Sequence, residues 1–516
     1  MFDQWIGKTF WITLGSLATS FLLAIIVFHN FSELIALVFM GLLVLVLTLW
    51  RLELGIFAAF IELFSNSHGH LISAELGGFN LSLRMIIFLA VMTGWVILLI
   101  AKKINLPPKD ARLVPFIPLF VAVIVGLAVG LTQNERAKAF DDSNAYFYLA
   151  YFFPILSVSW DVLKKRNLLQ VFAATATWVI ILTLSLLYTF THFPAWMLSA
   201  VYKFIRDTRT GELTKMTSSL FRIFLHAQFS VVIMAFLSAP WLVLKEISRR
   251  ARWGIWLVLS FIAATLLISL SRSFWVGIIA AGVIFIGLVL KLLKPKSKDF
   301  LKAGGISVGA GIFGAIILVL IILFPLPYRT GSAGELSNLF SERAGDTSDV
   351  AVSSRWNLLP EMWKEIAAAP LLGSGFGEEV TFKTDDPRAR EIYPDGTWTT
   401  YSFEWGWLDL WLKMGVLGPL AFLWLFVTLI RLLWIDKNRP AWLTTGLVAS
   451  IVMLYVTHVF SPYLNHPLGL GLLLFVLPFI EARSTKIPIH LPSSFTNPVQ
   501  KQITPTIPAP ITKQNV

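Results

Sequence analysis

Three arginines stand where apolar segments meet polar ones, a position that suits a phosphate-binding cation. Arg222 follows a Ser-Ser-Leu-Phe run, Arg272 stands between two serines, and Arg355 begins a helix-like pattern. The planar guanidinium offers paired donors to phosphate oxygens. Each arginine could instead be an ordinary interfacial or surface cation, because the side chain readily extends from apolar surroundings to water. The residues alone leave both roles open.

Glu404 is the acidic residue best placed for proton transfer. It lies in a Ser-Phe-Glu-Trp-Gly-Trp run, where a long polar segment returns to an apolar one. Burial could raise its pKa toward that of a general base, or the carboxylate could simply favour a helix N-terminus. The adjacent Trp405 suits a membrane interface or stacking against a sugar. His466, near the same face, is expected to contact the substrate and is the next candidate for the base.

Alternating glycines follow the helix-like segment that begins near Arg355. Residues 370–377 read Pro-Leu-Leu-Gly-Ser-Gly-Phe-Gly, which permits a tight turn and close backbone approach. We therefore assign Gly373 and Gly375 to substrate binding. No strand–helix unit follows, so a dinucleotide site is not predicted. No histidine pair stands at metal-ligand spacing with a carboxylate, and cysteine is absent, so we predict neither a metal nor another cofactor.

The elements that hold these residues must be membrane helices. The 516 residues are 56% hydrophobic and 14% charged, whereas soluble domains carry roughly a quarter charged residues. An ordinary core could not bury so much apolar surface, so lipid must solvate much of the chain. The net charge is +12, but the cations sit mostly in short loops between apolar runs. They therefore indicate membrane topology, and no nucleic-acid partner is predicted.

Apolar segments of about 20 residues predict an all-α, polytopic bundle of 12–14 spans. The third segment is short and carries Glu53 and Glu62, and Pro467 interrupts the last one. The first segment has no small-residue cleavage site after it, so we expect a retained helix. The fourteen segments lie near 10–29, 32–50, 52–66, 84–101, 113–131, 144–162, 169–191, 226–244, 253–270, 274–292, 304–324, 404–430, 441–460 and 462–481.

Orientation follows from the loops that hold lysine and arginine. Alternate loops carry 19 such cations, and the short loops between them carry three. Because cytoplasmic loops are enriched in these residues, the basic loops and both termini are expected inside. The basic loops are 102–112, 164–166, 245–252, 291–302 and 431–439, and the others are 132–143, 271–273 and 461.

This topology divides the chain into four parts. Residues 1–324 hold eleven helices and an outer loop at 192–225, and residues 325–403 form an extracytoplasmic cap. Residues 404–482 hold three further helices, and the Pro-rich segment 483–516 is expected to be a disordered cytoplasmic tail. Within the cap, Ser354 to Ala367 predicts a helix with Trp356, Leu359, Trp363 and Ile366 on one face, kinked or restarted at Pro360.

Taken together, these motifs resemble the O-antigen polymerase and ligase family of bacterial membrane proteins. Members have about a dozen spans, a Ser-Arg pair that opens a late helix, and a large external loop before the final spans. The resemblance is specific over about 253–430, and upstream it depends on hydropathy and Arg222. The matching stretches are Leu270 to Ser273, Arg355 to Ala369, Pro370 to Gly377, and the Gly-x-x-Gly of Gly415 to Gly418.

The sequence departs from the family where the chain returns to the membrane. Members carry His-Asn-x-x-Leu there, and the histidine is the expected base for the acceptor hydroxyl. Counted back from Gly415, that histidine position holds Glu404 and the asparagine position holds Trp405. An unperturbed glutamate has a pKa near 4.3, too low for easy proton abstraction at neutrality. Either Glu404 is perturbed, another group substitutes, or the chemistry differs.

The resemblance implies glycosyl transfer from a polyprenyl-diphosphate-linked glycan to an acceptor glycan or lipid. The enzyme would be an integral, multi-pass protein of the cytoplasmic (inner) membrane, acting without a metal on the extracytoplasmic side, and membrane lipids would surround it. Arg222, Arg272 and Arg355 would stabilise charge on the leaving diphosphate, and Glu404 would deprotonate the acceptor. The alternatives are a polytopic transporter or lipid-linked glycan flippase, or a structural membrane protein. Against transport, the sequence shows no pair of similar halves with broken helices.

The topology is testable with a reporter that is active only outside the cytoplasm. We expect a signal from a fusion after Asp385, in the cap, and none from a fusion after Thr504, because the cation bias places these positions on opposite sides. A signal after Thr504 together with silence after Asp385 would invert the topology.

Overall fold

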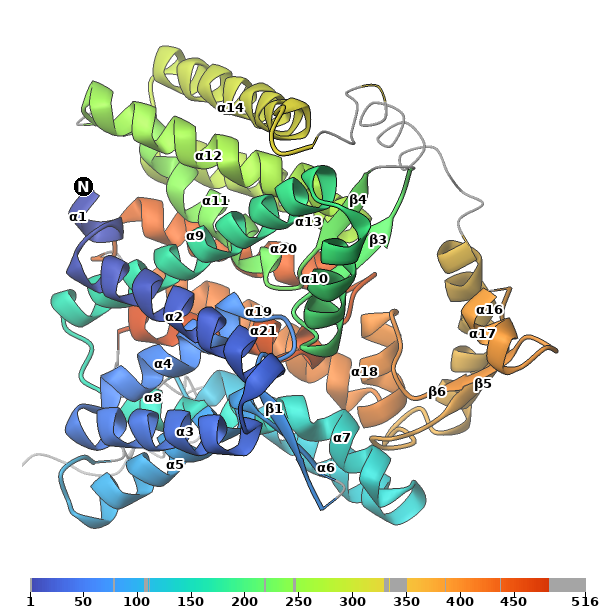
Figure 1. The fold of residues 1–516 in the computed structure, drawn as a ribbon. Coiled ribbons are helices and arrows are strands. Elements are labelled where there is room, and N and C mark those ends of the chain that lie inside the picture. The colour runs from blue at the N-terminus through green and yellow to red at the C-terminus, as the bar shows by residue number, and fades with distance from the viewer. Residues whose placement is uncertain are drawn as a thin grey trace, which may run out of the picture.

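The computed structural model describes residues 2–481 apart from 78, 106–109, 111, 218–219, 245–246, 329–333, 335–349, 386 and 437. The predicted disordered tail, 483–516, lies outside the described residues. Helices dominate, and strands occur as three separate antiparallel hairpins, β1–β2, β3–β4 and β5–β6 (Figure 1). The prediction of an all-α, polytopic membrane protein is confirmed.

The elements follow one another in the order used below. The first half forms α1 (Phe2–Trp5), α2 (Lys8–Asn30), α3 (Glu33–Trp50), α4 (Leu52–Ser65), β1 (Ser73–Leu76), β2 (Phe79–Ser82), α5 (Leu83–Ile100), η1 (Val114–Phe116), α6 (Ile117–Gln133), α7 (Arg136–Phe147), η2 (Tyr148–Tyr151), α8 (Phe152–Ser157), α9 (Val162–His192) and α10 (Ala195–Asp207). The second half forms β3 (Glu212–Lys215), β4 (Phe221–Phe224), α11 (Gln228–Ser238), η3 (Ala239–Val243), α12 (Arg249–Ser269), α13 (Arg272–Leu288), η4 (Val289–Leu293), α14 (Ser297–Leu323), α16 (Val350–Ala368), β5 (Val380–Lys383), α17 (Pro387–Ile392), β6 (Thr397–Thr400), α18 (Gly406–Met414), α19 (Leu417–Ile435), α20 (Ala441–Thr457), η5 (Tyr463–Asn465), α21 (Pro467–Val476) and η6 (Leu477–Phe479).

Nine helices in the described part of the chain are long and apolar enough to cross a membrane, and three shorter apolar helices accompany them. Two expected spans are broken. The segment 144–162 becomes α7, η2 and α8, with Pro154 in the first turn of α8, where its missing amide is tolerated. The segment 404–430 becomes α18 and α19, separated at Gly415, whose φ is +60°.

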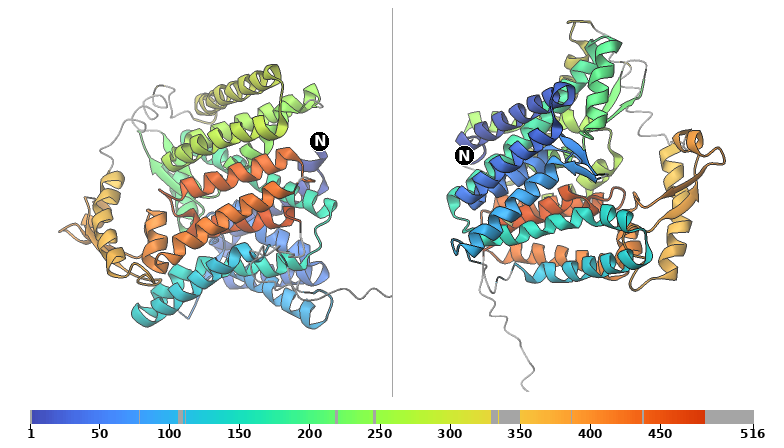
Figure 2. Two further views of the ribbon diagram at one scale, coloured as in Figure 1. Left: turned by 180° about the vertical axis from the view of Figure 1, so that it is seen from behind. Right: turned by 60° about the horizontal axis from the view of Figure 1, so that its bottom comes forward.

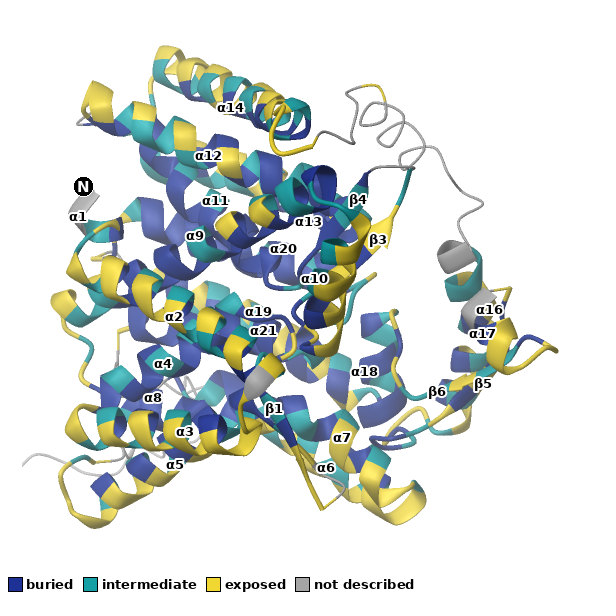
Figure 3. Cartoon of the chain, in the orientation of Figure 1, coloured by how far each residue is buried: buried dark blue, intermediate teal, exposed yellow. Residues whose placement is uncertain are grey.

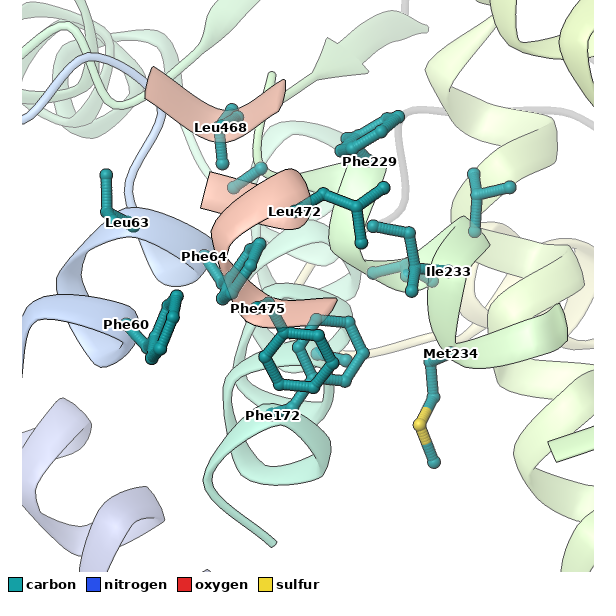
Figure 4. Close-up of a cluster of buried hydrophobic side chains, with 14 of the residues drawn as sticks. Phe60, Leu63, Phe64, Phe172, Phe229, Ile233, Met234, Leu468, Leu472 and Phe475 are labelled. Atoms are coloured by element: carbon teal, nitrogen blue, oxygen red, sulfur yellow. The ribbon is translucent and has the colours of Figure 1, made fainter. Parts of the chain in front are cut away.

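The helices enclose a buried interior, and the outer helices have many exposed residues (Figure 3). Peripheral helices expose large apolar side chains, such as Trp50 on α3, which is 74% exposed. The short helix α21 is instead buried at every position. Its Phe475 lies 4.9 Å from the ring of Phe172 on α9 and 5.7 Å from that of Phe64 on α4 (Figure 4). Protein surrounds the short central helices, so they need not match the bilayer thickness themselves.

The cap stands at one end of the bundle, and α18 lies between it and the membrane helices (Figures 1 and 2). The helix predicted from Ser354 is present as α16, and it continues through Pro360. Its buried residues are Leu358, Met362 and Ile366, which pack with β5 and α18. The expectation of one apolar face through Trp356 and Trp363 is wrong in part, because these rings are 59% and 54% exposed. They lie beside the buried stripe, in contact with Trp405 and Trp411 on the return segment.

The glycine segment 370–377 joins the cap to the bundle through backbone contact. Gly373, Gly375 and Gly377 all have φ between +75° and +85°. A Cβ on Gly375 would lie 2.3 Å from the backbone nitrogen of Gly130 on α6, and one on Gly373 would lie 2.4 Å from that of Gly415. The Phe376 amide donates to the Gly126 carbonyl at 3.2 Å. These contacts give the glycines a packing role, and the predicted substrate contact of Gly373 and Gly375 stays a prediction.

Gly375→Ala is expected to destabilise the protein by about 1–3 kcal/mol, because it adds a strained backbone conformation and a clash with α6. Thermal unfolding in detergent checks this. Gly282→Ala on α13 is the matched control, since a Cβ there has open space, and it should unfold at or above the wild-type temperature. Equal unfolding temperatures for Gly375→Ala and the wild type would contradict the packing role.

Candidate functional site

The hairpin β3–β4 places Arg222 against the end of α12. The Arg222 Nε donates to the Ser269 carbonyl at 2.9 Å, and its guanidinium lies 4.6 Å from the centre of the Phe224 ring. A guanidinium nitrogen is also 3.9 Å from a carboxylate oxygen of Glu212. The side chain is only 16% exposed. Ser269 lies three residues before Arg272 in the sequence. Arg222 is therefore held against the turn that leads to Arg272.

Arg272 opens α13 directly after a constrained turn. Leu270 has a φ of +48°, a left-handed conformation that is uncommon for a residue other than glycine. The Ser271 and Ser273 hydroxyls lie 3.1 Å apart, and the Ser461 hydroxyl donates to Ser273 at 3.0 Å. The start of α13 is therefore bound to the turn that follows α20.

Arg355 and Glu404 form an ion pair between the cap helix and the return segment. Their side chains are 37% and 52% exposed. The Trp405 indole donates to the Arg355 carbonyl at 2.9 Å, and its ring lies 5.8 Å from that of Phe460. Phe460 precedes Ser461, which holds the start of α13. The cap pair and the Arg272 segment therefore meet at the same turn.

The segments that carry Arg355, Glu404 and Arg272 thus contact Phe460 or Ser461, and Arg222 is bound to the end of the helix before Arg272. The structure brings Arg355 to Glu404, and it brings Arg222 to the segment of Arg272. The convergence of all three arginines on one cavity stays a prediction. The ion pair with Arg355 engages the Glu404 carboxylate that was predicted to act as the base.

His466, the second candidate for the base, caps α21. Its Nδ1 accepts from the Leu468 amide at 3.2 Å, which leaves the ring proton on Nε2. Burial, more than the neighbouring cations and rings, lowers the pKa of His466 well below its usual value. The ring is therefore neutral and has no free lone pair in this arrangement. Its predicted substrate contact stays a prediction.

Two histidines that sequence analysis missed lie beside His466. The ring centres of His68 and His226 are 4.6 Å apart, and they lie 5.3 Å and 5.9 Å from that of His466. Both line a cavity of about 520 Å³ beneath α10 and β3. Desolvation, then His226 and nearby arginines, lowers the pKa of His68 to about 2. Desolvation also lowers the pKa of His226. Both rings are therefore neutral near pH 7.

A buried ion pair fixes the loop that carries His68. Arg84 at the start of α5 binds Glu62 on α4 at 2.8 Å and donates to the Asn66 carbonyl at 3.1 Å. Ser67 donates to the Thr210 carbonyl at 2.5 Å, which joins the loop to the turn after α10. The oppositely charged Glu62 and Arg84, each inside an apolar segment, were the sequence signal for this arrangement.

The sequence analysis also missed a second network of buried charged residues. The Lys413 ammonium on α18 lies 2.6 Å from Asp142 on α7 and 2.7 Å from Asp409. Asp142 also accepts the Gly377 amide at 2.9 Å, and Asn465 donates to Asp409. The network connects the glycine segment, α7 and α18, and it reaches the turn at 458–466 through Asn465. It therefore positions the segment on which Glu404 is carried.

Residues 256–423 match a family model described as O-antigen ligase. The chain carries an O-antigen ligase domain. The domain contains Arg272, Arg355, the glycine segment and Glu404, and it ends within α19. A search of curated proteins found no match. The family resemblance is confirmed, and with nine apolar helices in the described residues the chain is an integral, multi-pass membrane protein. The match supports glycan polymerisation or ligation as its general activity.

The suppressed basicity of His68 predicts a pH-dependent stability. Above about pH 6.5 the ring is neutral in both the folded and the unfolded chain. As the pH falls from about 6.5 toward 2, the unfolded chain takes up a proton that the folded chain excludes, so unfolding is favoured. The unfolding temperature in detergent should fall between pH 7.5 and 5, and His68→Gln should reduce that fall. The exposed His29 supplies the control, His29→Gln. Identical pH profiles for the two variants would contradict the shift.

Proposed function

We propose that the chain transfers a glycan from a polyprenyl diphosphate to an acceptor hydroxyl at the outer face of the cytoplasmic membrane. The observation that carries this proposal is the match to an O-antigen ligase domain. It is supported by the Arg355–Glu404 ion pair, by the bond between Ser461 and Ser273 beside Arg272, and by the bond of Arg222 to Ser269. The lipid of the donor lies in the bilayer and its diphosphate at the membrane edge. Cations at this edge suit that charge distribution.

In the proposed reaction, the acceptor oxygen attacks the anomeric carbon of the donor sugar. The bond from that carbon to the phosphate oxygen breaks, and the electron pair leaves with the lipid diphosphate. Arg222 and Arg272 stabilise the negative charge that develops on the leaving group. The acceptor proton passes to the Glu404 carboxylate. Arginines supply the electrostatic stabilisation, so the reaction is proposed to be independent of a metal.

The Arg355–Glu404 pair gives the base a way to become available. Both side chains are partly exposed, so the pair contributes only about 0–1 kcal/mol. A bound diphosphate would compete for the Arg355 guanidinium and release the Glu404 carboxylate. The released carboxylate then takes the acceptor proton. Donor binding thereby precedes activation of the acceptor, which protects the donor from attack in an incomplete complex.

Glu404→Gln is expected to lower glycan transfer by roughly 10²–10⁴-fold, the usual contribution of a general base, with unchanged protein level in the membrane. Glycan chain length and attachment in cells that carry only the variant provide the measurement. Glu391→Gln, on the exposed face of the cap helix α17, is the control and should behave as wild type. A fully active Glu404→Gln variant would remove the base assignment, whereas activity in Glu404→His would support its equivalence to the family histidine.

Arg272→Gln and Arg222→Gln are each expected to reduce transfer at least tenfold, because removing one charge-assisted contact to the diphosphate costs about 1.5–3 kcal/mol. The same cellular assay checks this, with Lys203→Gln on α10 as the control for loss of an exposed cation. Full activity in both arginine variants would overturn the diphosphate site, independently of the outcome for Glu404.

A further inference from the structure

The cavity beneath α10 and β3 has more positive charge than its own acids balance. Four charged residues line it, namely Arg206, Arg209, Glu212 and Lys215. Arg206 pairs with Asp207 at 2.8 Å, and Glu212 lies 3.9 Å from Arg222. Within the described part of the chain, Arg209 and Lys215 make no ion pair. Two uncompensated cations therefore face one cavity.

The backbone at Arg209 is held in an uncommon conformation. Its φ is +49°, in the left-handed region, which residues other than glycine adopt less often. The flanking Thr208 and Thr210 hydroxyls are 2.8 Å apart, and the Thr210 carbonyl accepts from Ser67. This conformation ends α10, with the Thr210 amide donating to the Ile205 carbonyl at 3.0 Å, and it holds Arg209 at the cavity wall.

The rest of the lining consists of neutral hydrogen-bonding groups. His68 and His226 are uncharged, and the Nδ1 atom of His226 is buried without a partner in the described structure. Tyr202 and Thr214, which carry hydroxyl groups, also line the cavity. Neutral imidazoles and hydroxyls can each donate and accept, which suits the hydroxyl groups of a sugar.

The volume and charge of the cavity distinguish a sugar from an isolated diphosphate. About 520 Å³ lies within the roughly 300–1,000 Å³ of typical small-molecule sites. A diphosphate would leave much of it unfilled and would set several negative charges near Glu212. A single carboxylate can pair with Arg209 and Lys215 and leave Glu212 bound to Arg222.

We propose that this cavity binds a carboxylate-bearing sugar, a uronic acid, of the glycan. The inference depends on the proposed function, because it names the class of glycan that the enzyme handles. Arg209 and Lys215 pair with the sugar carboxylate, and the imidazoles and hydroxyls bind the ring hydroxyls. The cavity adjoins Arg222 through Glu212, and the His226 ring lies 4.9 Å from Phe224, against which Arg222 packs. An acidic sugar here lies next to the proposed diphosphate site.

The test measures binding of tetragalacturonate and maltotetraose to the full-length protein in lipid nanodiscs, with pyrophosphate as a third probe. Tetragalacturonate is expected to bind at least tenfold more tightly than the neutral sugar. The double variant Arg209→Gln, Lys215→Gln should lose that preference and leave pyrophosphate binding unchanged. Lys203→Gln on the exposed side of α10 is the matched control and should keep the preference.

Equal binding of the two sugars, or an unchanged preference in the double variant, overturns the proposal. A parallel loss of pyrophosphate binding also overturns it and makes the cavity a phosphate site. Thermal unfolding of each variant confirms that it is folded. The outcome is separable from that of the proposed function, because Arg272→Gln tests transfer in cells without altering this cavity. An active enzyme with no preference for the acidic sugar refutes only the present inference.

Discussion

Charges inside a lipid-solvated bundle must be neutralised by other protein groups, and this requirement governs the structure. A charge in the bilayer interior is costly unless it is paired or hydrated. Arg84 accordingly binds Glu62, and Lys413 lies between Asp142 and Asp409. These pairs fix loops and short helices that carry little apolar surface of their own. The end of the bundle that carries β3–β4 differs, because the exposed Arg209 and Lys215 give it a surplus of positive charge among the described residues. That surplus is what an anionic substrate can satisfy.

The cap is attached to the bundle by two kinds of contact with different consequences. The glycine segment packs backbone against backbone at Gly130 and Gly415, which leaves no space for side chains and makes the junction rigid. The Arg355–Glu404 pair is partly exposed and readily exchanged. Lys138 on α7 and Glu379 form a second partly exposed ion pair across this junction, at 3.1 Å. In the proposed mechanism, a ligand that binds Arg355 changes the state of Glu404 while the glycine contacts hold the cap in place. The exchangeable Arg355–Glu404 pair supports the proposal that Glu404, at the histidine position, takes part in proton transfer.

Much of the architecture could be predicted from the sequence because lipid exposure leaves a simple signal. Apolar length predicted the spans, and the Ser-Arg, glycine and return motifs predicted the ligase domain. Two spans were misjudged, because 144–162 and 404–430 are apolar enough to cross a membrane yet break at η2 and Gly415. The Trp356 and Trp363 face was predicted from periodicity, which cannot tell a packed stripe from an exposed aromatic one.

The site was predictable only in part, because its members come from distant segments. The arginines and Glu404 stood out through their positions beside apolar runs. His68 and His226 did not, since their proximity depends on the loop that Arg84 fixes and on the hairpin that follows α10. Lys413 and Asp142 were likewise invisible as a pair until α18 and α7 were placed together. Local patterns identify single residues, whereas tertiary packing decides which of them meet.

The most direct test of the central claim is a transfer assay with the purified protein reconstituted in vesicles with a polyprenyl-diphosphate-linked glycan and an acceptor, without a nucleotide sugar. The account predicts a new glycosidic bond and a stoichiometric amount of free polyprenyl diphosphate, both abolished by Arg272→Gln. Movement of the intact lipid-linked glycan across the bilayer with no new bond would contradict it and identify a transporter.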